Sequence, residues 1–99
     1  MEKRTPHYPL PEILAQMTRV EEMNLTLSAQ QGIRLAGMVA EDALKVVHGL
    51  TLADFYKSMT TNQNHRVWQD VYHAQWDGKW LYVKFQQAGD YFIVSFKEL

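Results

Sequence analysis

The first half of the chain repeats its apolar residues every three or four positions, which is the spacing of helices with one buried face. Leu10, Leu14 and Met17 form the first such stripe. Pro11 suits the first turn of a helix, where its missing N–H group costs little. We therefore expect a helix over residues 11–23.

Two further helices are expected before the middle of the chain. Ser28 and Gln31 form a capping-box pattern, which predicts that the second helix starts at Ser28. Gly32 weakens this helix because glycine is a poor helix former, and Gly37 is placed to end it. A third apolar stripe predicts a helix over residues 39–48.

The second half of the chain alternates apolar and polar residues with a period of two, which predicts strands. Residues 55–60 and 66–76 form the first two strands, joined by a polar turn. The Asp-Gly dipeptide at 77–78 is typical of a type I′ hairpin turn. A second turn at 88–90 leads to a last strand over residues 91–97. All but one of the aromatic residues lie in this half, as strand formation favours.

These elements predict an α+β fold in which N-terminal helices pack on one face of an antiparallel β-meander of four strands. Residues 25–27 are a candidate fifth strand. With 99 residues, 46% of them hydrophobic and 21% charged, the chain is expected to form one globular domain over residues 1–99. Cysteine is absent, and we find no membrane-spanning run and no signal peptide, so a cytoplasmic location is expected.

The alternation also predicts which polar side chains share a face. The helices are expected to cover the face of Trp68, Leu81 and Phe92. Lys57, which alternates with Tyr56, can join the other face. That open face then carries four polar residues: Gln69, Tyr82, Lys84 and Lys97. A merely solvated face is the alternative interpretation, and a β-bulge would reverse the assignment.

A face with lysines, a tyrosine and a glutamine suits a polyanion, although the net charge of −1 does not indicate a general nucleic-acid binder. RNA cleavage without a metal needs the 2′-hydroxyl deprotonated, the charged phosphorane stabilised and the leaving oxygen protonated. Lys57 or Lys97 could stabilise charge. Tyr82 or a lysine could move a proton if neighbouring cations lower its pKa. Gln69 could only position the substrate.

Other residues complete this hypothesis. Tyr56, Trp80 and Met59 could stack on or flank a base, and Lys84 could bind the substrate. The four histidines show no metal-ligand spacing, so no metal and no cofactor are expected. His65 and His73 share the face of Gln69 and could act as acid or base, with a solvated surface role as the alternative. Asp70 is interpreted as a solvated or capping group.

Four segments resemble the MqsR toxin family (motility quorum-sensing regulator). They are MEKRTPH at the start of the chain, DFYKSMTT from Asp54, WQDVY from Trp68 and IVSFKE from Ile93. The resemblance covers the whole length of the chain. Members of this family are small bacterial toxins that cleave mRNA, with a RelE/YoeB-like fold.

The resemblance implies an active site and a partner. The family pattern places the proposed catalytic residues at Lys57, Gln69, Tyr82 and Lys97. It implies a metal-independent endoribonuclease that cuts mRNA at short GC-containing sites such as GCU. It also implies an MqsA-like antitoxin with a zinc domain and a DNA-binding domain, through which alone the toxin would influence transcription.

Two other functions stay open from the sequence. The first is a non-catalytic α+β module whose open face or edge strand binds a protein. The second is a cleaver of the broader RelE class that acts only on ribosome-bound mRNA. Cleavage of free RNA would distinguish this ribosome-dependent function from the activity that the family resemblance implies.

Overall fold

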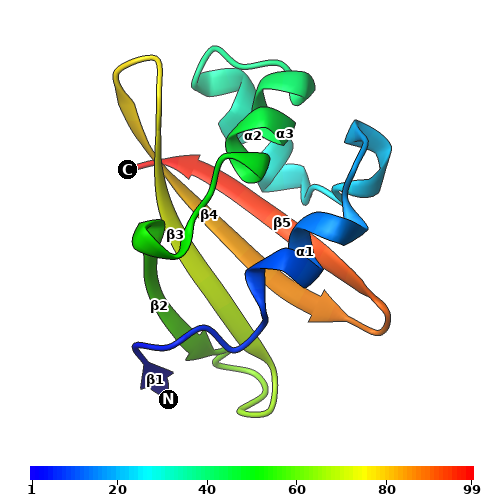
Figure 1. Ribbon diagram of the computed structural model, residues 1–99, viewed down its shortest axis with the longest axis vertical. Helices are drawn as coiled ribbons and strands as arrows, with labels where there is room; N and C mark the ends of the chain where they lie inside the picture. The colour runs from blue at the N-terminus through cyan, green and yellow to red at the C-terminus, as the bar shows by residue number, and fades with distance from the viewer.

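The computed structural model describes residues 1–99 and has the predicted α+β architecture, with three helices and a five-stranded antiparallel sheet (Figure 1). The strand order is β1-β2-β3-β4-β5, so neighbours in the sheet are also neighbours among the strands of the chain. The elements are β1 (Glu2–Lys3), α1 (Leu10–Gln16), α2 (Leu27–Leu35), α3 (Ala40–His48), β2 (Phe55–Thr60), β3 (Trp68–Trp76), β4 (Lys79–Ala88) and β5 (Tyr91–Glu98). Short 3-10 turns lie at Val20–Glu22 and Leu52–Asp54.

The first helix is shorter than predicted, because a cap interrupts it. The Glu22 carboxylate accepts hydrogen bonds from the backbone N–H groups of Thr18 and Arg19, at 3.0 and 3.1 Å. These contacts start a separate 3-10 turn at Val20, so the apolar stripe continues although the helix does not.

None of the helices is long and apolar enough to cross a membrane.

The second helix begins at Leu27, and its N-cap lies two residues before the predicted cap Ser28. Thr26 is the N-cap, and its hydroxyl accepts a hydrogen bond from the N–H group of Ala29 at 3.0 Å. Gly37 follows the helix with φ of +81°, a left-handed conformation that favours glycine. The third helix lies where it was predicted, within one residue.

The sheet is the predicted meander with one strand added at its edge. Asp77 and Gly78 both have positive φ, 49° and 74°, as the predicted type I′ turn requires. The prediction of a fifth strand at 25–27 is wrong. Leu25 makes one parallel bridge to Val94, and the fifth strand is β1, which pairs with β2.

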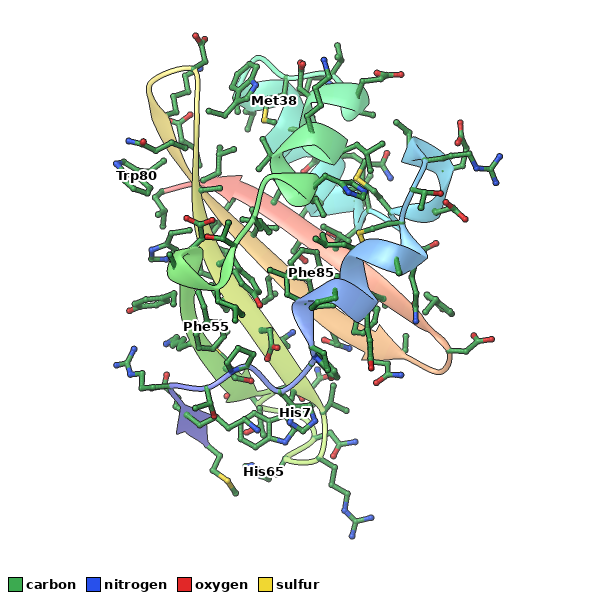
Figure 2. The ribbon with its side chains drawn as sticks, in the orientation of Figure 1. His7, Met38, Phe55, His65, Trp80 and Phe85 are labelled. Atoms are coloured by element: carbon green, nitrogen blue, oxygen red, sulfur yellow. The ribbon has the colours of Figure 1, made fainter.

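The helices cover the face of the sheet that the alternation predicted. A cluster of 20 buried residues fills the space between the two layers, including Phe85, Val94 and Phe96. Phe85 lies between sheet and helices, whereas Trp80 points away from the core and is 52% exposed (Figure 2). The opposite face of β2–β5 is not covered by any helix, and we call it the open face.

Asp70 departs from its predicted role as a solvated or capping group, because its side chain is fully buried on the covered face. Its carboxylate accepts hydrogen bonds from the N–H groups of His7 and Tyr8, at 2.9 Å each, and from the Ser58 hydroxyl at 2.6 Å. A buried carboxylate needs such donors to offset its lost hydration. Asp70 therefore fastens the segment that precedes α1 to the middle of the sheet.

Gly32 explains how closely α2 approaches β5. A Cβ atom at this position would overlap the carbonyl oxygen of Phe96. The glycine that weakens the helix by propensity thus permits the helix to pack directly on the backbone of the last strand.

We predict that Gly32→Ala destabilises the protein, although alanine favours a helix by about 1 kcal/mol. The added methyl group must push α2 away from β5, and overpacking of this kind costs roughly 1–3 kcal/mol. Urea unfolding measures the difference. Gln31→Ala, at an exposed position of the same helix, should change stability by less than about 0.5 kcal/mol. A Gly32→Ala protein more stable than wild type would show that the contact is not tight.

Candidate active site

Cross-strand pairing arranges the candidate residues of the open face in three rows that run across the sheet. Residues paired directly across two strands lie on the same face, with Cβ atoms roughly 4.5–5.5 Å apart. The structure therefore brings Lys57, Gln69, Tyr82, Lys84 and Lys97 to one face, whereas His65, which was predicted to share it, lies outside the strands. The rows are His73–Tyr82–Lys97, then Lys57–Val71–Lys84–Ser95, and then Met59–Gln69–Gln86–Ile93.

A β-bulge in β2 adds Tyr56 to this face. The register shifts between Phe55 and Lys57, so Tyr56 and Lys57 do not alternate as predicted. Instead, the Tyr56 ring stacks on His73 with centroids 4.3 Å apart, while Lys57 lies opposite Val71. The bulge gives β2 two neighbouring side chains on the open face, one aromatic and one cationic.

Three predicted site residues line one cavity on β4 and β5. This cavity of about 270 Å³ is lined by Tyr82, Lys84 and Lys97, together with the hydroxyl-bearing residues Ser28 and Ser95. The Lys97 ammonium lies 4.8 Å from the centroid of the Tyr82 ring. The cavity therefore combines two cations with three hydroxyl groups, a set suited to an oxyanion.

The cavity shifts the pKa values of two of its members in opposite directions. Burial raises the pKa of Tyr82, although the Lys57 charge acts against it. Tyr82 therefore does not meet the condition set above for moving a proton, a pKa lowered by neighbouring cations, because burial outweighs the effect of the Lys57 charge. Burial and the nearby charge of Lys97 instead lower the pKa of Lys84. Tyr82 thus holds its proton, and Lys84 gives one up more readily than an ordinary lysine.

Lys57 is paired with an acidic residue from the N-terminal strand. Its ammonium lies 2.6 Å from a carboxylate oxygen of Glu2, and the Lys57 side chain is 21% exposed. This hydrogen bond raises the pKa of Lys57 and lowers the pKa of Glu2. This ion pair could not be predicted from the sequence, because 55 residues separate its two members.

Gln69 lies beside Lys57 but away from the cavity. Its Nε2 donates a hydrogen bond to Oε1 of Gln86 at 2.7 Å, and Met59 faces it from β2. From strand spacing and rise, its Cα lies roughly 16 Å from that of Lys97. The predicted residues therefore form a strip across the face, and only an extended ligand could contact all of it.

The two candidate histidines have different surroundings. His73 sits within the strip, with Tyr56 stacked on it and the Tyr82 ring 6.2 Å away. His65 is exposed in the loop between β2 and β3 (Figure 2). No three His, Cys, Asp or Glu side chains are grouped so that they could hold a metal ion.

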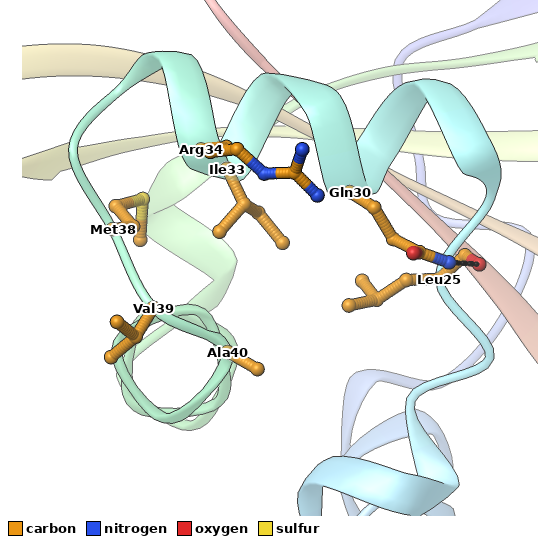
Figure 3. Close-up of a pocket in the computed structure, with 7 residues that line it drawn as sticks. All are labelled: Leu25, Gln30, Ile33, Arg34, Met38, Val39 and Ala40. Carbon is orange, nitrogen blue, oxygen red and sulfur yellow. Dashed lines mark hydrogen bonds between the residues drawn. The ribbon is translucent and has the colours of Figure 1, made fainter.

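A separate groove lies between α2 and α3, on the other side of the molecule's core (Figure 3). It measures about 370 Å³, and five of its seven lining residues are hydrophobic, among them Ile33 and Met38. Arg34 is its one titratable side chain. The groove lacks the paired acid and base groups that catalysis needs, so the open face is the candidate active site.

Fold and site together define an α+β protein with helices on one sheet face and a cation-bearing strip on the other. Residues 5–98 match the family model described as "Motility quorum-sensing regulator, toxin of MqsA". The chain is also 39% identical over 98 residues to the mRNA interferase toxin MqsR of Escherichia coli (strain K12), a match that covers 99% of each chain. The chain therefore belongs to the MqsR toxin family, as the resemblance predicted.

We predict that Glu2→Gln lowers the pKa of Lys57 toward its ordinary value of 10.5. The reason is that a neutral amide stabilises the ammonium less than a carboxylate does. NMR titration of the Lys57 side chain measures the change. Glu21→Gln removes the same charge from an exposed turn next to the helices and should leave Lys57 unchanged. An unaltered Lys57 titration in Glu2→Gln would mean that the ion pair does not form in solution.

Proposed function

We propose that this protein is the toxin of a type II toxin–antitoxin pair and an endoribonuclease that cleaves mRNA without a metal ion. The observation that carries the proposal is the cavity in which Tyr82, Lys84 and Lys97 converge, at one end of the strip that also contains Lys57 and Gln69. Membership of the MqsR family and the name of the relative, mRNA interferase, support the same activity.

The chemistry follows from what RNA itself supplies. The 2′-hydroxyl attacks the adjacent phosphorus, the bond to the 5′-oxygen breaks, and the products are a 2′,3′-cyclic phosphate and a 5′-hydroxyl. One protein group must take the proton of the 2′-hydroxyl and another must protonate the leaving oxygen. Tyr82 stays protonated, because burial raises its pKa, and its hydroxyl can donate to the leaving oxygen; Lys84, whose pKa is lowered, can accept once deprotonated.

The remaining cations stabilise the charge that develops on the phosphorane. Lys97 lines the same cavity, and Lys57 stays protonated because its pKa is raised. Fixed charges in a partly desolvated site contribute more than the same charges in water. Gln69 holds the substrate by hydrogen bonds, since its amide cannot titrate.

Aromatic and apolar side chains at the edge of the strip would hold the bases. Tyr56 is 42% exposed above His73, and Met59 lies opposite Gln69. Base stacking on such rings is typical of single-stranded RNA recognition. Short GC-containing sites of the GCU type, as in the family, are the cleavage preference that we propose.

The family description, toxin of MqsA, implies an antitoxin. We propose an MqsA-like protein as the partner, with DNA contacted only through that complex and with mRNA in the cytoplasm as the target. Glu2 competes with substrate phosphates for Lys57, so RNA binding would need this ion pair to open.

The proposal predicts cleavage of a free RNA of about ten to twenty nucleotides in EDTA, because the chain's own side chains supply both charge and protons. Mass spectrometry of the products should find 2′,3′-cyclic phosphate ends. Lys97→Ala, purified in the same way, guards against a contaminating nuclease. A reaction that stops in EDTA and resumes with added magnesium, manganese or zinc would refute metal independence, and cleavage only on ribosomes would favour the RelE-class alternative.

Gln69→Glu should slow cleavage more than Gln69→Ala. The alanine variant loses positioning hydrogen bonds worth about 0.5–1.5 kcal/mol. In Gln69→Glu, the new carboxylate also repels the phosphate and attracts the Lys57 ammonium away from it. At ~5 Å and an effective dielectric near 20, this repulsion is about 3 kcal/mol, or roughly a hundredfold in rate.

Single-turnover cleavage rates of wild type, Gln69→Ala and Gln69→Glu, measured at low and high salt, test this order. The loss of rate in Gln69→Glu should become smaller at high salt, because salt screens the repulsion. Gln75→Glu is the matched control, since Gln75 is exposed on the same strand and the same face, opposite Trp80. A Gln69→Glu protein as active as wild type at low salt would remove Gln69 from the site.

A further inference from the structure

A third concavity opens on the molecule at the end of β2 and β3, beside Gln69. Its volume is about 450 Å³, within the range of roughly 300–1,000 Å³ typical of small-molecule pockets. Five of its seven lining residues end in a carboxamide: Asn62, Gln63, Asn64, Gln69 and Gln86. We call it the amide pocket.

The amide pocket contains no charged side chain. A phosphate site needs cations or several N–H groups aimed at one point, as in the cavity lined by Lys84 and Lys97. Carboxamides present a donor and an acceptor side by side, which is the pattern on the edge of a nucleobase. The lining therefore suits the base of a nucleotide better than its phosphate.

Hydrogen bonds within the protein fix what the pocket offers. Nε2 of Gln69 donates to Oε1 of Gln86 at 2.7 Å, and both side chains are half-buried. This bond leaves Oε1 of Gln69 as an acceptor and the Gln86 NH₂ group as a donor. Oδ1 of Asn64 accepts from the backbone of Arg66 at 2.9 Å, which leaves its NH₂ group free to donate.

The loop that forms the far wall is shaped in advance of any ligand. The Thr61 hydroxyl donates a hydrogen bond to the carbonyl of Asn64 at 3.0 Å. The backbone N–H group of Asn64 donates to the same hydroxyl oxygen, also at 3.0 Å. The backbone N–H of Thr61 also donates to the carbonyl of Val67 at 3.0 Å. A wall held in this way loses less entropy on binding than a mobile loop would.

We infer that the amide pocket binds one nucleobase of the RNA substrate by its hydrogen-bonding edge and so selects the sequence that is cleaved. The inference rests on the proposed function. Gln69 belongs to the pocket and also lies diagonally from Lys57, so the base belongs to a nucleotide next to a phosphate held by that lysine. Gln86, which no part of the cleavage chemistry requires, is a specificity residue.

Gln86→Leu tests the inference, because leucine keeps the bulk of the side chain and removes its donor and acceptor. Cleavage rates and equilibrium binding are measured on short RNAs that differ by one base at each position in turn, with 2′-O-methyl versions for binding. We expect the preference of wild type at one position to fall at least about tenfold in Gln86→Leu, since a well-paired amide discriminates by about that factor or more.

The matched control is Gln87→Leu, the same change at the next residue. Gln87 is exposed, lies outside the amide pocket and donates to the carbonyl of Gly89. It should keep the wild-type preference. A double variant of the exposed loop, Asn62→Ala with Gln63→Ala, should lose preference at the same RNA position and decides the matter if Gln86→Leu does not fold.

Other outcomes overturn the inference. An equal loss on all RNAs means that Gln86 only holds Gln69 in place. An unchanged preference, or a wild type with no preference at any position, means that the pocket reads no base. A wild type that binds these RNAs selectively but cleaves none refutes the proposed activity and not the pocket, because binding alone then reports the selection.

Discussion

The hydrogen bonds to the buried Asp70 carboxylate fix where the first ten residues lie. Two backbone N–H groups and the Ser58 hydroxyl donate to it, while the Tyr8 hydroxyl donates to the carbonyl of Trp68. Because this segment is tied down, β1 can pair with β2, and Glu2 comes to lie against Lys57. Removing one hydrogen-bond partner of a buried charge costs much of the free energy of folding. The cluster around Asp70 therefore holds the N-terminal segment in place, and with it the Glu2 carboxylate that pairs with Lys57 on the open face.

The sheet separates stability from chemistry by assigning one face to each. The covered face supplies the apolar core, which contains residues of β3, β4 and β5 and fixes the register of these three strands. The open face then presents its rows of side chains with no freedom to slip. Val71 is buried even on that face, beneath longer neighbours such as Lys57 and Lys84, and so forms a floor that partly desolvates the charges above it.

Much of this arrangement could be predicted from the sequence, because alternation determines faces. Gln69, Tyr82, Lys84 and Lys97 lie on the face that the pattern indicated. The bulge at Tyr56 could not be predicted, since alternation is the very rule that a bulge breaks. Asp70 alternates along its strand in step with Trp68 and Tyr72, which indicates the buried face, but its charge favoured an exposed position. The Glu2 pair and the cavity wall from Ser28 depend on tertiary contacts between distant segments.

In the proposed function, RNA binds to the open face and not to the groove between α2 and α3. The most direct test is an NMR titration of the ¹⁵N-labelled protein with a short 2′-O-methyl RNA that cannot be cleaved. We expect the largest chemical-shift changes at residues of the strip, such as Lys57, Gln69, Tyr82 and Lys97. Changes confined to the groove, around Ile33 and Met38, would contradict it.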